Sequence, residues 1–381
     1  MSKKLKLLIV DDIEINRLII SELFSEKYDV IEAQNGKEAL EVMDGEPEIA
    51  IVLLDIVMPV MDGFGVLKAM NESGKINSIP VIIITGREDD EMALESYSLG
   101  VSDVIHKPFN AAIVNQRVTN VINLYVYKND IEEQLVGLKR ETSIAKDIQN
   151  SILPVNDEYL NIIGINAEYL PVGDLGGDVY DLVKLSDNEV LVYIADVAGH
   201  GIQASLLTIY LRENIRANAS AAQKSLGALV KKLLASYQAL DIDAAMYIGL
   251  LLCKYNKKKK ELSILNVGHN CYPLVIRRDG AVEEVVVRGM PISKFNGGDT
   301  NDPESVGVYQ GDRLLLFTDG LAEEHDFPKQ ETFGAEGVRN VAAEYHHLPG
   351  RELAKKIIGE AEKFTAGEAK DDRTVVIADI L

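Results

Sequence analysis

Short apolar segments in the first third of the chain are each followed by a polar residue that could take part in phosphoryl chemistry. Asp11 and Asp12 follow the first of these segments, Asp55 follows a later one, and Thr85 and Lys107 follow the last two. Carboxylate oxygens are hard ligands that suit Mg²⁺. One of the carboxylates could also accept a phosphoryl group, whose oxygens a hydroxyl and an ammonium group can stabilise. These residue types suggest an acidic Mg²⁺ site at which an aspartate is phosphorylated.

The last two thirds of the chain contain a second acidic set, in which each aspartate stands close to glycine or to another aspartate. Several carboxylates from separate parts of a chain can hold two divalent ions about 3.5–4 Å apart, which activate a shared water for in-line attack on a phosphoryl group. Glycine lets the main chain come close to an ion. A single Asp-Gly pair is a common turn signal, so only the ordered set supports this interpretation. The set comprises Gly176-Gly177-Asp178, Asp196-Val197-Ala198-Gly199-His200-Gly201, Thr318-Asp319-Gly320 and Asp371-Asp372.

The elements that would position the first set alternate between short apolar runs and amphipathic stretches. This alternation is typical of parallel β/α units and predicts an α/β doubly wound, five-stranded parallel sheet. In such a sheet the ligand site lies beyond the carboxyl ends of the strands, where the first set would converge. The predicted strands cover residues 5–10, 29–33, 49–54, 81–84 and 101–105, and the predicted helices cover 14–27, 36–43, 63–71, 90–99 and 111–123.

Residues 5–123, within a predicted receiver domain at residues 1–123, resemble the CheY-like receiver family, most specifically in the segment Asp55-Ile56-Val57-Met58-Pro59-Val60-Met61-Asp62-Gly63. The resemblance implies that a histidine kinase phosphorylates Asp55. It also implies that Asp11 and Asp12 hold Mg²⁺ together with Asp55, and that Thr85 and Lys107 contact the phosphate.

One departure from the receiver family concerns signal transmission. Val104 stands three residues before Lys107, where receivers often have an aromatic side chain that switches between two positions. We expect phosphorylation to be kept and transmission through a swinging aromatic side chain to be lost.

Residues 124–155 are predicted to form a helical linker, because apolar or small residues recur there near heptad spacing. Polar residues interrupt this seam, so any coiled coil would be short and imperfect. The helix could pair with its copy in a homodimer, which we favour, or lie against one of the domains. A two-state helix would give the first domain a physical route to the second. The seam consists of Leu124, Ile131, Leu135, Leu138, Ala145 and Ile152, and the interruptions are Lys128, Thr142 and Gln149.

Residues 156–381 have short, β-rich apolar runs, with helix-like stretches at residues 204–217, 225–240 and 350–364. The ordered acidic set resembles the PPM family of protein phosphatases, specifically the bacterial branch that includes sporulation and general-stress regulators. The match begins at Asp147-Ile148-Gln149-Asn150-Ser151-Ile152-Leu153-Pro154 and includes Asn266-Val267-Gly268-His269-Asn270. It implies an α+β domain, an αββα sandwich in which two antiparallel sheets lie between outer helices.

The same resemblance implies two Mn²⁺ or Mg²⁺ ions, which suit a site made only of oxygen ligands. Asp372 takes a supporting place beside the ligands. His200 could donate a proton to the leaving serine oxygen, although we expect His200 and His269 to orient turns. The implied ligands are Asp178, Asp196, Asp319 and Asp371, with the carbonyl oxygen of Val197 as a main-chain ligand.

Together the two resemblances predict a response regulator that controls a Ser/Thr protein phosphatase, whose substrate in this branch is typically a STAS-type anti-sigma-factor antagonist. The alternative is a non-catalytic adaptor that binds a partner through a phosphatase-like domain, against which the retained aspartates argue. A nucleotide cyclase, suggested by Gly176-Gly177-Asp178, is rejected because that signature continues with Glu-Phe, whereas this chain continues with Val179-Tyr180-Asp181.

Composition limits the remaining functional classes. The formal net charge of −21 opposes binding to a phosphate backbone, so we expect no nucleic-acid partner. No apolar run approaches the roughly 20 residues of a membrane span, which favours a cytoplasmic protein. The basic cluster Lys257–Lys260 lies between two apolar runs and is interpreted as a solvated hairpin tip, and Cys253 and Cys271 are expected to be reduced and buried.

Overall fold

The computed structural model describes residues 4–46, 48–86, 90–154, 158–160, 162–199, 201–298, 301–322, 325–326, 331–364 and 370–381. The chain divides into two compact units, Met1–Leu138 and Lys139–Leu381. One long helix, α5 (Ala111–Ile152), runs from the first unit into the second. A helical linker thus joins the two units, as the heptad-like pattern predicts.

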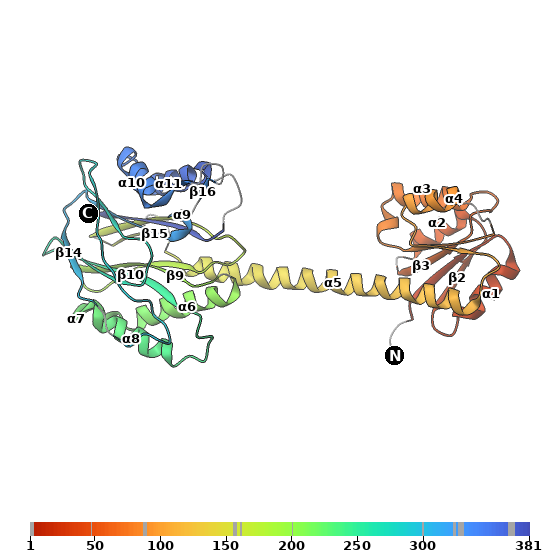
Figure 1. Ribbon diagram of the computed structural model, residues 1–381, viewed down its shortest axis with the longest axis horizontal. Helices are drawn as coiled ribbons and strands as arrows, with labels where there is room; N and C mark the ends of the chain where they lie inside the picture. Colours follow the sequence, from red (N-terminus) through yellow and green to blue (C-terminus); the bar gives the residue numbers. More distant parts are fainter. Residues whose placement is uncertain are drawn as a thin grey trace. The chain divides into compact units, whose positions relative to one another are not determined.

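The first unit is built on a twisted sheet with helices around it (Figure 1). The sheet is parallel, with strand order β2-β1-β3-β4-β5. The apolar runs of the sequence form these strands because both faces of the sheet are covered by helices, so that the central strands β3 and β4 are buried along their whole length. The strands are β1 (Lys6–Val10), β2 (Asp29–Ala33), β3 (Ile49–Leu54), β4 (Val81–Thr85) and β5 (Asp103–His106).

Helices pack on both faces of this sheet. Ile20 and Phe24 of α1 and Val118 of α5 belong to the core on one face, whereas Met43 of α2 and Met70 of α3 belong to the core on the other. This is the doubly wound arrangement that the sequence predicts. The helices are α1 (Glu14–Phe24), α2 (Gly36–Gly45), α3 (Gly63–Glu72) and α4 (Asp90–Ser98), with a short 3-10 helix at Lys75–Asn77.

The second unit contains two antiparallel sheets, of five and six strands. The first has the order β14-β11-β10-β9-β8 and the second has the order β13-β12-β15-β18-β7-β6. The strands are β6 (Glu158–Leu160), β7 (Ile163–Leu170), β8 (Asp178–Lys184), β9 (Glu189–Val197), β10 (Ile248–Asn256), β11 (Glu261–Val267), β12 (Leu274–Ile276), β13 (Val282–Glu284), β14 (Glu304–Gly307), β15 (Arg313–Phe317) and β18 (Arg373–Ile380), and β16 (His325–Asp326) pairs separately with β17 (Glu331–Thr332).

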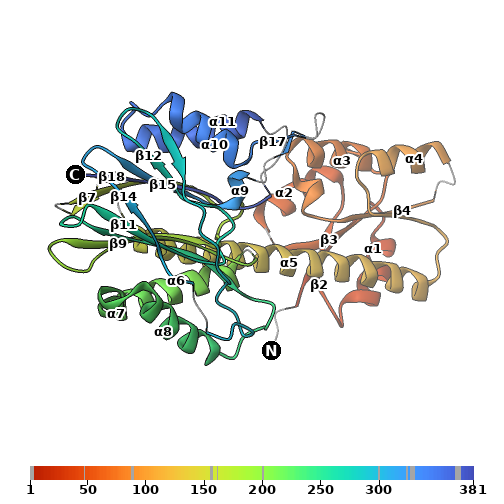
Figure 2. The ribbon, with the colours of Figure 1, turned by 60° about the vertical axis from the view of Figure 1, so that its left-hand side comes forward.

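The two sheets face each other, and helices cover their outer faces (Figure 2). Successive residues of a strand point to opposite faces of its sheet and so pack into different cores. Val192 and Ile194 of β9 pack in the core between the two sheets, whereas Tyr193 packs in the core between the sheet and the helices. The unit is therefore the predicted αββα sandwich. One outer layer contains α6 (Ile202–Ala217), α7 (Ala219–Lys224) and α8 (Leu226–Gln238), the other contains α10 (Gly334–Glu344) and α11 (Gly350–Phe364), and the short α9 (Asp319–Ala322) follows β15.

Several smaller predictions can also be compared with the structure. Asn256 pairs with Glu261 across the β10–β11 hairpin, so the exposed residues Lys257–Lys260 form the predicted tip. Cys253 and Cys271 are buried, and the two described cysteines are not joined by a disulfide, as expected. Among the described residues, no helix has the length and apolar composition needed to cross a membrane.

Candidate functional site

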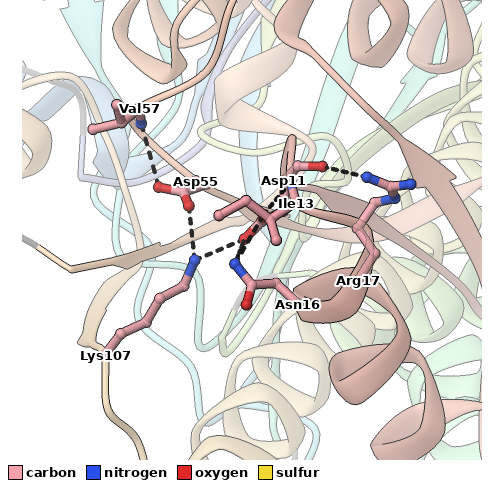
Figure 3. Close-up of polar contacts among 7 residues, drawn as sticks. All are labelled: Asp11, Ile13, Asn16, Arg17, Asp55, Val57 and Lys107. Atoms are coloured by element: carbon pink, nitrogen blue, oxygen red, sulfur yellow. Dashed lines mark hydrogen bonds and ion pairs between the residues drawn. The ribbon is translucent and has the colours of Figure 1, made fainter.

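The carboxyl ends of β1 and β3 bring the first acidic set together. One carboxylate oxygen from each of Asp11, Asp12 and Asp55 lies within 4.8 Å of the others. The Lys107 ammonium contacts two of them, at 2.7 Å from Asp11 Oδ2 and 2.7 Å from Asp55 Oδ2 (Figure 3). The arrangement offers three hard oxygen ligands beside one positive charge, and so fits a divalent cation such as Mg²⁺.

Electrostatics in this site follow from its partial burial. Burial raises the pKa of the Asp55 carboxyl, against the opposing effect of the Lys107 hydrogen bond. Burial alone would lower the pKa of Lys107, but its hydrogen bonds to Asp11 and Asp55 outweigh this and raise the pKa. Lys107 therefore stays charged, and it neutralises part of the carboxylate charge.

The remaining first-set residues are held by the ends of neighbouring strands. Thr85 ends β4 and is fully buried, and its carbonyl accepts a 2.7 Å hydrogen bond from the main-chain N–H of Lys107. Sequence reasoning missed Asn16, whose amide donates to both Asp11 oxygens at 3.1 Å. Its position in the first turn after the Asp11 segment is the only signal that could have indicated this contact. Val104 is buried in the core of the unit.

In the second unit, the acidic set is organised around Asp178 and Asp196. These residues are direct cross-strand partners on β8 and β9. Asp178 is only 2% exposed, and its Oδ2 accepts hydrogen bonds from the hydroxyls of Thr318, at 2.9 Å, and Thr374. Because Thr318 directly follows β15 and Thr374 lies on β18, these bonds connect the two sheets at the acidic end.

The environment of Asp178 disfavours a negative charge that no proton or cation balances. Burial, followed by the negative charge of Asp196, raises the pKa of Asp178 well above its ordinary value, while the threonine hydroxyls oppose the shift. Two neighbouring carboxylates, one of them buried, repel each other unless one of them is protonated or a positive ion lies close to both. The residues therefore fit divalent metal ions with oxygen ligands.

The carboxylate of Asp372 accepts hydrogen bonds from two main-chain N–H groups. The residue is 4% exposed, and it accepts hydrogen bonds from the N–H of Val172 at 2.8 Å and from that of Gly177 at 2.5 Å. Its neighbour Asp371 is exposed and accepts a 2.8 Å hydrogen bond from the Asp372 N–H. Asp371 thus offers its side chain to solvent, whereas Asp372 fixes the turn that leads into β8.

The segments that carry Asp319 and Asp372 touch through their backbones. Asp319 begins α9, and a Cβ added to the next residue, Gly320, would lie 2.1 Å from the Asp372 carbonyl oxygen. Asn270 donates to Asp319 Oδ2 at 2.7 Å. Asn270 belongs to a loop that the buried Asn266 side chain closes through bonds to the His269 main chain, at 2.9 and 2.8 Å.

The main chain near Val197 also faces the turn before β8. A Cβ at Gly177 would lie 2.8 Å from the Val197 carbonyl oxygen, so a side chain there would displace the proposed main-chain ligand. His200 lies outside the described residues. His269 is buried, with Nδ1 3.0 Å from the Cys271 carbonyl oxygen, which agrees with a structural role in its loop.

The two acidic sets differ in how closely they gather. Among the described residues, the group Asp11, Asp12 and Asp55 is the one in which three ligand atoms lie within 4.8 Å of one another. The second set does not meet this criterion for one ion. A set divided between two ions need not meet it, because each ion takes only some of the ligands.

Sequence reasoning missed several residues that support the second set. Thr318, Thr374 and Asn270 contact the aspartates directly, and only their places beside Asp319, Asp372 and the Asn266 loop could have indicated this. Tyr169 lies beside the same turn: a Cβ at Gly176 would lie 1.9 Å from its hydroxyl oxygen. Burial, with the charges of Asp372 and Asp178, raises the pKa of Tyr169, so that it stays a neutral phenol.

Comparison with known proteins agrees with this architecture. The receiver fold in the first unit and the αββα sandwich in the second define a response regulator with a PPM-type phosphatase output domain. A family model described as "Response regulator receiver domain" matches residues 7–119. A second model, described as "Stage II sporulation protein E (SpoIIE)", matches residues 186–381, just over half of the chain. The chain belongs to this SpoIIE family.

Individual relatives cover different parts of the chain. The SiaA-PP2C domain of Pseudomonas aeruginosa superposes with a TM-score of 0.57 at 19% identity, over 65% of this chain and 98% of that one, and shows the fold. The Regulator of RpoS of Escherichia coli K12 is 26% identical over 284 residues, 70% of this chain and 82% of that protein. A probable cyclic di-GMP phosphodiesterase of Vibrio cholerae is 37% identical over 112 residues, 29% of this chain, and the match spans only 25% of its length.

Proposed function

We propose that phosphorylation of Asp55 controls a metal-dependent Ser/Thr protein phosphatase in the second unit. The observation that supports the proposal is the burial of Asp178 beside Asp196, its direct partner on the neighbouring strand. Hydroxyl groups of Thr318 and Thr374, from the opposite sheet, hold the Asp178 carboxylate. Desolvating a carboxylate beside another carboxylate is costly, and the cost is offset when the pair binds divalent ions.

We assign the metal ligands to the aspartates at the acidic end of the sandwich, together with one carbonyl oxygen. Two Mn²⁺ or Mg²⁺ ions, when bound, would supply Lewis-acid activation of water and of the phosphoryl group. The chain's own contribution is to fix the ligands: Thr318 and Thr374 hold Asp178, and Asp372 holds the turn before it. We propose that His200 orients its turn, and the alternative role is donation of a proton to the leaving oxygen. The ligands are Asp178, Asp196, Asp319, Asp371 and the Val197 carbonyl.

In the receiver we assign Asp55 as the residue that a histidine kinase phosphorylates. Asp11 and Asp12 would hold Mg²⁺ together with Asp55, which agrees with their grouping within 4.8 Å. Lys107 already contacts Asp55, so its ammonium is placed to bind an oxygen of the phosphoryl group. Thr85, at the end of the neighbouring strand, would bind another.

The substrate we propose is a phosphoserine or phosphothreonine protein of the STAS type, an anti-sigma-factor antagonist in a cytoplasmic partner-switching pathway. Membership of the SpoIIE family supports this class. We divide the chain into a receiver at residues 1–123, a linker at residues 124–155 and a phosphatase domain at residues 156–381.

We further propose that the linker helix pairs with its copy in a homodimer. Large apolar side chains recur along α5 at intervals of three or four residues and are half or more exposed. Such a face is energetically unfavourable in water, and pairing would bury it. These residues are Leu124, Tyr127, Ile131, Leu135 and Leu138.

The direct test is phosphate release from a phosphoserine STAS protein, with and without Mn²⁺, by the parent protein and by Asp196→Asn. The proposal expects release that requires Mn²⁺ and is lost in the variant. The alternative is a non-catalytic adaptor. A relative named only as the Regulator of RpoS is compatible with this alternative. Binding of the phosphoprotein without Mn²⁺-dependent release in any receiver state would favour the adaptor.

A further inference from the structure

Gln149 interrupts the apolar seam of the linker helix, yet it is among the most buried polar residues of the second unit. Only 3% of its surface is exposed, whereas the helix is exposed at every position from 131 to 140. An unpaired amide in such a place would cost free energy, so its partners show what the residue is for.

Both ends of the Gln149 amide are bonded to one residue. Nε2 donates to the Gly176 carbonyl at 2.7 Å, and Oε1 accepts from the Gly176 N–H at 3.3 Å. Nε2 also lies 3.3 Å from the Thr208 hydroxyl, on the middle of α6. The last turns of α5 are thus attached to the glycine turn before β8 and to the helix beside it.

The next residue in the turn is held in the same way by the acidic site. The N–H of Gly177 donates to Asp372, and its carbonyl accepts from the Val197 N–H at 3.0 Å. All four main-chain polar groups of the two glycines therefore have partners, supplied by Gln149, Asp372 and Val197. Glycine is the most freely rotating residue, so without these partners the turn would not fix the direction in which the chain enters β8.

We propose that Gln149 is a positioning residue of the phosphatase metal centre, acting through Gly176 on Asp178 two residues later. This rests on the proposed function. The linker helix then does more than connect the two units, because its last turns supply part of the framework that holds a metal ligand. Residues that orient ligands in this way typically change metal affinity or activity by about 10–100-fold when they are replaced.

The test compares Gln149→Met with Gln134→Met, the same change on the exposed part of the same helix. Both are made in full-length protein carrying Asp12→Asn and Asp55→Asn, so that bound Mn²⁺ reports on the second unit. Mn²⁺ binding is followed by electron paramagnetic resonance of the free ion, and p-nitrophenyl phosphate hydrolysis is titrated with Mn²⁺. Gln149→Met is expected to raise the half-saturating Mn²⁺ concentration about tenfold, with little change in KM for the phosphate ester.

Amide hydrogen exchange gives a readout that does not depend on the metal. Exchange across residues 172–180 should be faster in Gln149→Met than in Gln134→Met, while exchange in β10 is unchanged. If Gln149→Met does not fold, Gln149→Glu keeps the size and the acceptor but loses the donor to Gly176, and it should shift Mn²⁺ binding in the same direction.

The outcomes separate this inference from the function on which it rests. If the parent binds Mn²⁺ and hydrolyses the ester, but Gln149→Met does so with unchanged half-saturation and only a lower melting temperature, Gln149 is structural and the inference is wrong. If the parent neither binds Mn²⁺ nor hydrolyses the ester, the proposed function itself fails, and the inference fails with it.

Discussion

The receiver and phosphatase units each concentrate carboxylates at one end of a sheet, but they control the negative charge differently. In the receiver, Lys107 lies 2.7 Å from two of the aspartates and supplies a cation that belongs to the chain. In the phosphatase unit, the side chains that donate to Asp178 are hydroxyls, and the charges that shift its pKa are those of other acids. Hydroxyls orient a carboxylate without neutralising it.

This difference suggests that the two sites differ in how much they need a bound metal ion to balance their negative charge. The receiver site is partly neutralised by Lys107 without any ion, so it would keep its geometry with or without the proposed Mg²⁺ and phosphoryl group. The phosphatase site holds its carboxylates against their repulsion by using the rest of the fold, and the proposed ions would relieve that repulsion. Four experiments test the contrast, beginning with the one that has the largest expected effect.

Asp55→Asn should abolish labelling of the protein by acetyl phosphate, because the proposed acceptor oxygen is lost. Transfer of radiolabelled phosphate to the protein measures this. Asp62→Asn is the matched control: Asp62 caps α3 through a 2.8 Å bond from the Gly65 N–H, which an asparagine oxygen can also accept, and labelling should be unchanged. Persistent labelling of Asp55→Asn would place the acceptor elsewhere.

Asp178→Asn should lower Mn²⁺-dependent phosphatase activity by about a hundredfold or more, the upper end of what the loss of metal-site support costs. Its effect on metal-free stability should be the opposite. A carboxyl with a raised folded pKa destabilises the fold as pH rises above its ordinary value of 3.8, so the variant should melt at a higher temperature than the parent at pH 7 in EDTA. A lower melting temperature in EDTA would contradict the account of repulsion given above.

Asn270→Ala should weaken Mn²⁺ binding by roughly tenfold, because Asp319 loses the amide that orients one of its oxygens. Asn270→Asp should weaken it further, since a like charge would then face Asp319. Titration of activity with Mn²⁺ measures both. Equal half-saturation in all three proteins would show that Asp319 needs no orienting partner.

Lys107→Met should change the pH dependence of receiver stability, and this is the smallest of the expected effects. The pKa of Lys107 is raised in the folded state, so its contribution is fully present below the unfolded value of about 10.5 and is lost as pH rises through the folded pKa. Thermal melts between pH 9 and 12 should show a steeper loss for the parent than for the variant. Parallel curves would mean that the ammonium does not stabilise the folded receiver.

The regular parts of the fold were predictable wherever apolar periodicity was uninterrupted. The predicted strands at residues 29–33 and 49–54 and the predicted helix at 350–364 agree with β2, β3 and α11 at both ends. The strand β8 was not predicted, because Asp178 and Asp181 are buried on its two opposite faces, and buried acids break the apolar pattern. The helix α10 was also missed: Gly334 and Gly337 disfavour a helix locally, and burial of Val338 outweighs them.

The candidate sites were predictable in their acidic residues and much less so in the residues that hold them. Asp11, Asp12 and Asp55 were found because each follows an apolar run in a parallel sheet, whose strand ends converge. Thr318, Thr374 and Asn270 could not be found in this way, because ordinary polar residues acquire a role only through contacts between distant segments. Gln149 was interpreted as a defect in a heptad seam, since its burial depends on a glycine turn 27 residues away.

Gly320 fixes the spacing between two backbone segments of the phosphatase site. Its missing methyl group lets the first turn of α9 rest on the peptide group of Asp372, where any larger residue would push the two segments apart. The distance between the backbone at Asp319 and the backbone at Asp371 is therefore fixed by direct contact between the two backbone segments. Side chains around the centre can diverge while this distance stays constant, so distant homologues that keep the chemistry should keep glycine at this position.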